Sequence, residues 1–321
     1  MLLVVHPYTS FCCVFLKFIT AAFFTRVKKK NNLLIILLFE LICNFLLPQN
    51  KTHSAEQMTI ADIPTSFWFG VVLSFFTYIF CSCISHYFSS TLYPALTDET
   101  FKNKSEKIIF HTYLPSAVHA VAQTLNMWFP ALVSTAHYSN RVMHFDAELF
   151  VDNGVFIGYG PTFWSGIFVG YLVTDLLVVI KYEKPLMILH HIFASVTWTV
   201  AVSNRSLQWY MCFLQLNELS TIFLSSRHIV VTGRGWNKTS TKVAVLNFVT
   251  FMTFTAIRVL PLPFVLYNYW STDMHVLRKH AGDVSFYLIW STLIFHAVMQ
   301  TFWFSLFVRH AFLKKNKNKA E

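Results

Sequence analysis

Long apolar segments constrain this chain more than any other feature of its sequence. A helix that crosses a bilayer needs about 20 consecutive, mostly apolar residues. Because the bilayer core offers no water to the backbone, segments of this kind form helices. The sequence therefore predicts an all-α polytopic membrane protein, a bundle of seven transmembrane helices. The predicted spans are 67–87, 112–135, 162–180, 186–203, 209–226, 243–268 and 286–308.

The low charge content excludes a water-soluble protein of this length. Charged residues make up 12% of the chain and hydrophobic residues 55%, whereas soluble domains are about 25% charged. The formal net charge is +10, but the basic residues form short clusters between the apolar segments. Such clusters are typical of membrane orientation signals and headgroup contacts. We therefore predict membrane lipids as partners and no nucleic acid.

The distribution of Lys and Arg predicts the orientation. If the C-terminus is cytosolic, the cytosolic connections hold 14 Lys and Arg residues and the opposite connections hold five. Positive charge concentrates on the cytosolic side, so 309–321 is predicted to be a basic cytosolic tail. Residues 1–65 form an N-terminal extension with a shorter apolar segment at 33–47. The charge pattern favours this segment as an eighth span, although its length is short for one.

Two motifs point to the endoplasmic reticulum. Lys317 and Lys319 form a K-x-K-x-x ending that resembles the cytosolic retrieval signals of proteins of that membrane. Asn50 begins an N-x-T glycosylation motif on the predicted lumenal side. We therefore expect a multi-pass protein of the endoplasmic reticulum membrane.

Several ionisable and amide side chains fall inside the predicted spans. A charge at the bilayer centre costs about 2.5–3.5 kcal/mol on insertion scales, so each of these residues needs a reason. One interpretation is a polar pocket that opens toward the cytosolic leaflet. The alternative is structural pairs that join helices, for example Asp175 with a histidine, or Glu218 with Arg258. The candidate pocket residues are His119, Asp175, His190, His191, Asn217, Glu218, Arg258 and His296.

Neither metal nor cofactor is expected at this pocket. Adjacent residues on a helix point about 100° apart, whereas two ligands on one face need a spacing of three or four residues. His190 and His191 therefore do not form a metal-binding pair. The six cysteines lie within apolar segments without a C-x-x-C pair, and no glycine-rich phosphate-binding motif is present.

Three motifs on consecutive predicted spans resemble the TLC domain family. They are G-Y-x-x-x-D at 170–175, H-H at 190–191 and N-E-L-S-T at 217–221. Ceramide synthases, translocating-chain-associated membrane proteins and small proteins of lipid homeostasis share this domain. The resemblance implies a TLC domain over 66–308. Within the family the chain is most similar to the branch of TLC domain-containing protein 4, the transmembrane-protein-56-like branch.

The resemblance also suggests a chemistry. In ceramide synthases a histidine pair and two nearby carboxylates serve acyl transfer from acyl-CoA to a sphingoid amine, so His190 and His191 are the catalytic candidates here. The next motif departs from that pattern, because Asn217 and Thr221 replace the family's histidine and second carboxylate.

The leading hypothesis is therefore a protein that binds, senses or moves a lipid in the pocket and contributes to lipid homeostasis. One alternative is an N-acyltransferase that uses acyl-CoA. Another is an ion or solute transporter, because intramembrane carboxylates and histidines can relay protons. The sequence leaves open which lipid is bound and the oligomeric state.

Overall fold

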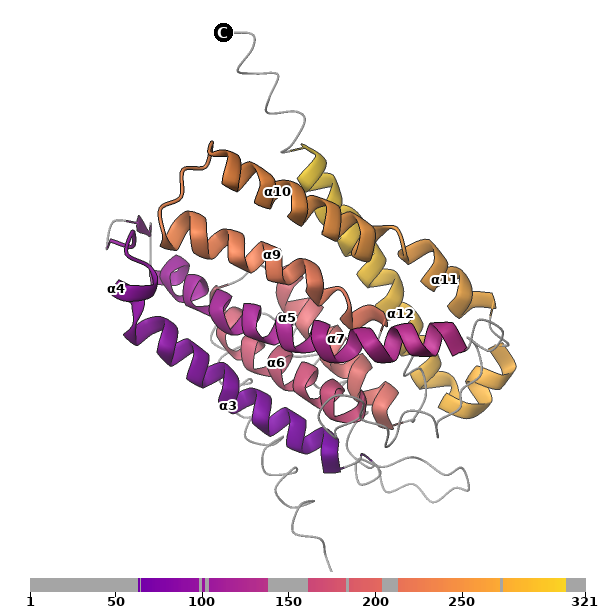
Figure 1. The fold of residues 1–321 in the computed structure, drawn as a ribbon. Helices are drawn as coiled ribbons and strands as arrows, with labels where there is room; N and C mark the ends of the chain where they lie inside the picture. The colour runs from indigo at the N-terminus through magenta and orange to yellow at the C-terminus, as the bar shows by residue number, and fades with distance from the viewer. Residues whose placement is uncertain are drawn as a thin grey trace, which may run out of the picture.

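The computed structural model describes residues 63, 65–97, 100–101, 104–137, 161–182, 185–203, 213–271 and 274–309. All regular elements among them are helices (Figure 1), which confirms the predicted all-α membrane fold. The predicted span 33–47 and Asn50 lie outside the described residues. Lys317 and Lys319, in the predicted tail, also lie outside them.

The described part of the chain holds the following helices. In chain order they are α3 Thr65–Tyr87, α4 Ser89–Leu92, α5 Lys104–His137, α6 Pro161–Tyr182, α7 Pro185–Ser203, α9 Glu218–His228, the π-helix η4 Ile229–Gly233, α10 Thr241–Phe254, the π-helix η5 Thr255–Val259, α11 Leu262–Ser271 and α12 Met274–Val308.

Four stretches of described helix are long and apolar enough to cross a membrane. They correspond to the predicted spans 67–87, 186–203, 243–268 and 286–308. The predicted span 162–180 lies within α6, whose apolar part is shorter, and the predicted span 112–135 lies within the 34-residue helix α5. The four long stretches are Thr65–Tyr87, Pro185–Ser203, Thr241–Tyr267 and Gly282–Val308.

The helix predicted to end at residue 226 continues further. Its described part is α9, which passes directly into η4 and ends at Gly233. The side chains of Arg227 and His228 do not end the helix because neighbouring helices hold them. Arg227 Nε donates to Asn247 Oδ1, and the His228 ring stacks on Tyr113 with centroids 4.5 Å apart. The polar end of this helix is therefore part of the bundle.

Six helical segments form a closed ring. Each segment contacts the next in the order α5, α6, α7, α12, the continuous α10–η5 segment and α9. Helix α9 then contacts α5 and closes the ring. Helix α3 lies outside the ring and packs on α5 and α6 (Figure 1). The largest apolar cluster joins α3, α6, α7, α11 and α12.

Small residues bring α3 and α6 close together. A Cβ at Gly166 would lie 2.0 Å from the Phe67 carbonyl oxygen, and one at Gly70 would lie 2.4 Å from the Phe163 carbonyl oxygen. These approaches are backbone to backbone, so no side-chain rotation could relieve them. Small residues at such crossings are typical of membrane helix pairs.

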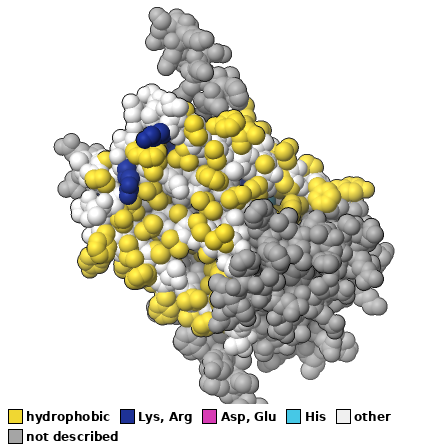
Figure 2. Space-filling model, in the orientation of Figure 1, with side chains coloured by type: hydrophobic (Ala, Val, Ile, Leu, Met, Phe, Trp, Pro, Cys, Tyr) yellow, Lys and Arg dark blue, Asp and Glu magenta, His cyan; other side chains and the backbone are white. Residues whose placement is uncertain are grey.

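The outer surface is suited to lipid. Figure 2 shows hydrophobic side chains over most of the described face, with Lys and Arg side chains toward the end where α10 begins. Large apolar side chains point outward from several helices, as a bilayer environment allows. They include Phe76, Phe80, Phe248, Leu260 and Val298, all more than 60% exposed.

Candidate functional site

A cavity of about 910 Å³ lies inside the ring of six helical segments. All six contribute to its wall, and α3 does not. Its volume falls within the range of small-molecule sites, about 300–1,000 Å³. The cavity is therefore large enough to hold a ligand among the helices.

Polar and apolar groups occupy different parts of the wall. Toward the end where α7 and α10 begin and α9 ends, the wall carries Arg227, His228 and Asn247. Toward the opposite end of α7 it carries Trp198 and Ala201, which lie about 12 Å and 16 Å along that helix from His190 at 1.5 Å per residue. Most of the candidate polar residues lie between these two regions.

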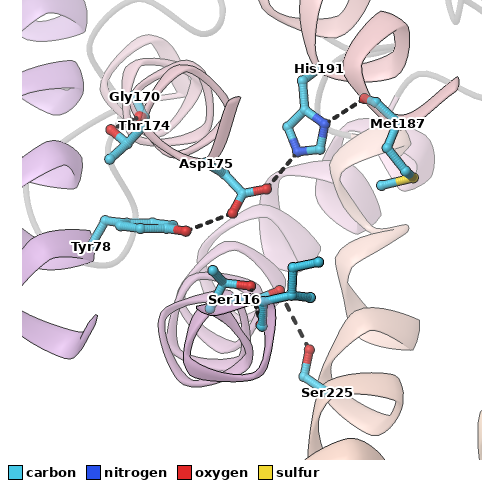
Figure 3. A network of polar contacts seen from close by, with 10 residues as sticks. Tyr78, Ser116, Gly170, Thr174, Asp175, Met187, His191 and Ser225 are labelled. Atoms are coloured by element: carbon cyan, nitrogen blue, oxygen red, sulfur yellow. Dashed lines mark hydrogen bonds and ion pairs between the residues drawn. The ribbon is translucent and has the colours of Figure 1, made fainter. Parts of the chain in front are cut away.

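Asp175 is the centre of a buried polar network (Figure 3). Its Oδ1 accepts a hydrogen bond from the Tyr78 hydroxyl at 2.7 Å, and its Oδ2 lies 2.8 Å from Nε2 of His191. His191 Nδ1 donates to the Met187 carbonyl at 2.8 Å. Asp175 and His191 are 6% and 4% exposed. The network links α3, α6 and α7.

The Asp175–His191 pair is electrically neutral as a unit. Because Nδ1–H donates to a carbonyl, one further proton lies between Nε2 and the carboxyl group. The pair is then imidazolium with carboxylate or imidazole with carboxylic acid, and both forms sum to zero charge. Both ring nitrogens of His191 have partners, so neither is free for a ligand.

His190 differs from its neighbour. It lies on the cavity wall, and its ring contacts are with His191, His296 and Trp303, at centroid distances of 5.5, 6.3 and 5.9 Å. In the described part of the chain its ring nitrogens have no hydrogen-bond partner. Of the two adjacent histidines, His190 is therefore the one available to a ligand.

The π-helix η5 presents Arg258 to the start of α9. Arg258 Nε donates to the Asn217 carbonyl at 3.2 Å and to Ser220 Oγ at 2.6 Å. Its Nη2 donates to the same carbonyl at 3.0 Å and to Thr221 Oγ1 at 2.6 Å. Arg258 therefore binds neutral oxygens of α9, and π-helical turns of this kind are frequent at functional sites.

Glu218 does not pair directly with Arg258. Both side chains line the cavity, but no nitrogen–oxygen contact within 4.0 Å joins them. Arg258 is held instead by Ser220 and Thr221, which lie in the same first turn of α9 as Glu218. The predicted alternative of a direct Glu218–Arg258 pair is therefore wrong.

His296 is held by two amide groups. The side-chain nitrogens of Asn217 and Gln300 lie 3.2 and 3.3 Å from His296 Nε2. His296 and Asn217 thus join α12 to the start of α9.

The structure brings seven of the eight candidate pocket residues to one wall: Asp175, His190, His191, Asn217, Glu218, Arg258 and His296. His119 is not on that wall. It packs behind it, stacked on Tyr171 with centroids 3.9 Å apart. Burial inside a span made His119 a candidate, but the direction of its side chain was not readable from sequence.

Three residues of the site were not among the sequence candidates. Tyr78 gave no signal, because a tyrosine in an apolar span is ordinary. Arg227 and Asn247 lie near predicted span ends, where polar residues are common. Arg227 reaches the wall because α9 continues past residue 226, and Asn247 reaches it from α10.

A second polar cluster closes the bundle near the α3–α5 connection. The Ser85 hydroxyl lies 3.0 Å from both the Tyr93 hydroxyl and His111 Nδ1. Tyr93 lies in the connection between helices, and its burial raises the pKa of its phenol above the usual value of 10. The Tyr93 ring packs against Gly233, at the end of η4. This cluster positions the helix ends around the cavity.

These features define a polytopic helical membrane protein with a polar cavity enclosed by its helices. The chain belongs to the TLC domain family: the family model of the TLC domain, which groups TRAM, LAG1 and CLN8, matches residues 116–309. Proteins of this family are membrane-associated and linked to lipid metabolism or lipid sensing. Comparison with curated proteins and with solved structures gave no match.

Proposed function

We propose that this protein binds a lipid inside the helical ring and thereby contributes to membrane lipid homeostasis. The observation that carries the proposal is the cavity itself, which combines an apolar region with a concentrated set of polar groups. A lipid has the same division, since its acyl chain is apolar and its headgroup is polar.

The apolar region suits an acyl chain. Phe168, Trp198 and Leu293 line it, and removing an acyl chain from water is favourable by about 0.8 kcal/mol for each CH₂ group. A hydrogen bond between Thr197 and Thr292, at 2.7 Å, satisfies the hydroxyl groups of this region within the protein. The headgroup would then lie against His190, Glu218 and Arg258.

A cavity-filling substitution tests this proposal. Ala201→Phe places a ring in the apolar region, and Val298→Phe is the matched control because Val298 is 62% exposed on the outer surface. We expect lipid to co-purify with the wild type and the control and to be lost from Ala201→Phe, as measured by mass spectrometry. Equal lipid content in all three proteins, together with an unchanged lipidome in knockout cells, would contradict the proposal.

A second candidate function is N-acyl transfer from acyl-CoA to a lipid amine. His190 favours it, because its ring nitrogens lack partners on the cavity wall and an activated histidine can act as base or nucleophile. Against it, Thr221 replaces the family's second carboxylate and accepts a hydrogen bond from Arg258. Membranes supplied with labelled fatty acid and sphingoid base should yield no labelled ceramide. Product formed by the wild type and lost in His190→Ala would establish the enzyme instead.

The branch of the family and the cellular membrane in which the protein lies are also proposals. We place it in the TLC domain-containing protein 4 branch and in the endoplasmic reticulum membrane, with a cytosolic C-terminus. The supporting features are the motifs at 170–175, 190–191 and 217–221 and the basic ending with Lys317 and Lys319. Replacing both lysines by serine should move the protein to later compartments, and an unchanged distribution would remove this support.

A further inference from the structure

Two charged side chains near the start of α9 lie on the cavity wall without a charged partner. Glu218 and Arg258 both line the cavity, and neither forms an ion pair within 4.0 Å with another described residue. A third charged wall residue, Arg227, is bound to Asn247 near the other end of α9. The other acidic wall residue, Asp175, is paired with His191. Charges removed from bulk water are costly unless they are paired and hydrogen-bonded, so these two groups can still gain from a ligand.

The hydrogen bonds of Arg258 leave one face of its guanidinium group available. Its four hydrogen bonds use Nε and Nη2. Among the described residues Nη1 has no partner, and it is not one of the fully enclosed unpaired atoms. Arg258 is therefore held through Nε and Nη2 of its guanidinium group, and the two N–H groups of Nη1 can donate to an anion.

Glu218 lies close enough to Arg258 to act on the same small ligand. Arg258 donates to Ser220 and Thr221, two and three residues after Glu218 in the first turn of α9, so the two charged groups lie at the same end of this helix without an ion-pair contact. A cation placed against Glu218 would favour its ionised form, because a nearby opposite charge favours the charged state.

From this arrangement we infer that the cavity selects a lipid with a zwitterionic headgroup, an ammonium group against Glu218 and a phosphate or carboxylate against Arg258. This inference rests on the proposed lipid-binding function and names the headgroup class for the same site. The two charges of such a headgroup match Glu218 and Arg258 in sign, whereas Arg227 lies nine residues further along α9. A headgroup with one charge would leave one wall residue unpaired.

Lys242 provides the matched control for charge. It is exposed near the start of α10 and does not line the cavity. Removing its charge changes the net charge of the protein by the same amount as removing that of Arg258, without touching the proposed headgroup position.

The test uses the purified full chain in detergent micelles and four lipids with oleoyl or oleyl chains of the same length. They are lysophosphatidylethanolamine, lysophosphatidic acid, oleylamine and monooleoylglycerol, which are zwitterionic, anionic, cationic and neutral. Competition against a fluorescent fatty acid gives their relative affinities. The wild type should bind the zwitterionic lipid about tenfold or more better than the other three, the effect of one additional charged hydrogen bond.

The variants should shift this preference in opposite directions. Glu218→Gln is nearly isosteric and should lose about tenfold toward the zwitterionic lipid while it keeps binding lysophosphatidic acid. Arg258→Gln should weaken both phosphate-containing lipids, and Lys242→Gln should leave the order unchanged. If Arg258→Gln does not fold, Glu218→Gln still decides the question.

Two results would overturn the inference. Equal binding of all four lipids by the wild type, or equal loss of all four in Glu218→Gln, would show that the charged groups do not select the headgroup and would leave lipid binding intact. Binding of none of the four would overturn the proposed function as well. The two failures are therefore distinguishable.

Discussion

Replacing Asp175 tests whether hydrogen bonds or charge hold the buried network together. Asp175→Ala would leave the Tyr78 hydroxyl and Nε2 of His191 without partners, and both residues are 4% exposed. A buried polar group left unpaired costs about 1–3 kcal/mol. The two groups together should therefore lower the free energy of unfolding by roughly 2–6 kcal/mol.

Asp175→Asn should have a much smaller effect. The asparagine oxygen can accept from the Tyr78 hydroxyl, and its amide nitrogen can donate to Nε2 of neutral His191, whose Nδ1–H keeps the Met187 carbonyl. Both contacts survive without a charge, so the expected loss is below about 1 kcal/mol. Tyr78→Phe removes one of the two contacts and should fall between these variants.

The assay is equilibrium unfolding of the full chain in mixed micelles with increasing dodecyl sulfate, followed by tryptophan fluorescence. The folded-to-unfolded ratio should fall about 30-fold to 10⁴-fold for Asp175→Ala, at about tenfold per 1.4 kcal/mol. If Asp175→Asn is as unstable as Asp175→Ala, the carboxylate charge holds the network, and the hydrogen-bond reasoning is refuted.

Three further predictions concern other parts of the chain. Gly166→Leu should destabilise the α3–α6 contact by about 1–3 kcal/mol or more in the same assay, because its Cβ would lie 2.0 Å from a backbone oxygen; Val298→Leu, on the outer surface, should not. Arg258→Lys keeps the charge but loses the fork, so hydrogen exchange of amides 217–221 should become faster, and unchanged exchange would contradict the role of Arg258 in holding α9. Asn50→Gln should abolish a mobility shift caused by deglycosylation; a shift that persists in this variant would place the glycan elsewhere.

Most of the fold was predictable from sequence because its main signal is strong and local. Apolar segments of about 20 residues predict helices that cross a membrane whatever their neighbours. The continuation of the helix past the predicted span end at residue 226 has a physical reason. The sequence shows that Arg227 and His228 are polar, but their partners Asn247 and Tyr113 are brought to them only by the folded bundle.

The site was predictable as a set of residues but not as an arrangement. The cost of polar groups in a bilayer identified seven residues that the structure brings to one wall. The same reasoning included His119, because cost alone does not distinguish a residue that faces the cavity from one that stacks behind it. Pairing was less predictable still, since Arg258 binds three oxygens of α9 instead of the nearby carboxyl group.

Polar groups that already have partners contribute to stability, whereas polar groups that lack charged partners can select a ligand. Asp175 and His191 are saturated by Tyr78 and Met187, and this network ties α3, outside the ring, to the cavity wall. A ligand gains nothing from groups that already have partners. Glu218 and Arg258 form no ion pair with a described residue, and Arg258 binds only neutral oxygens of α9, so they retain charge that a ligand can use. Substitutions at Asp175 should therefore change unfolding more than lipid preference, whereas Glu218→Gln should change lipid preference more than unfolding.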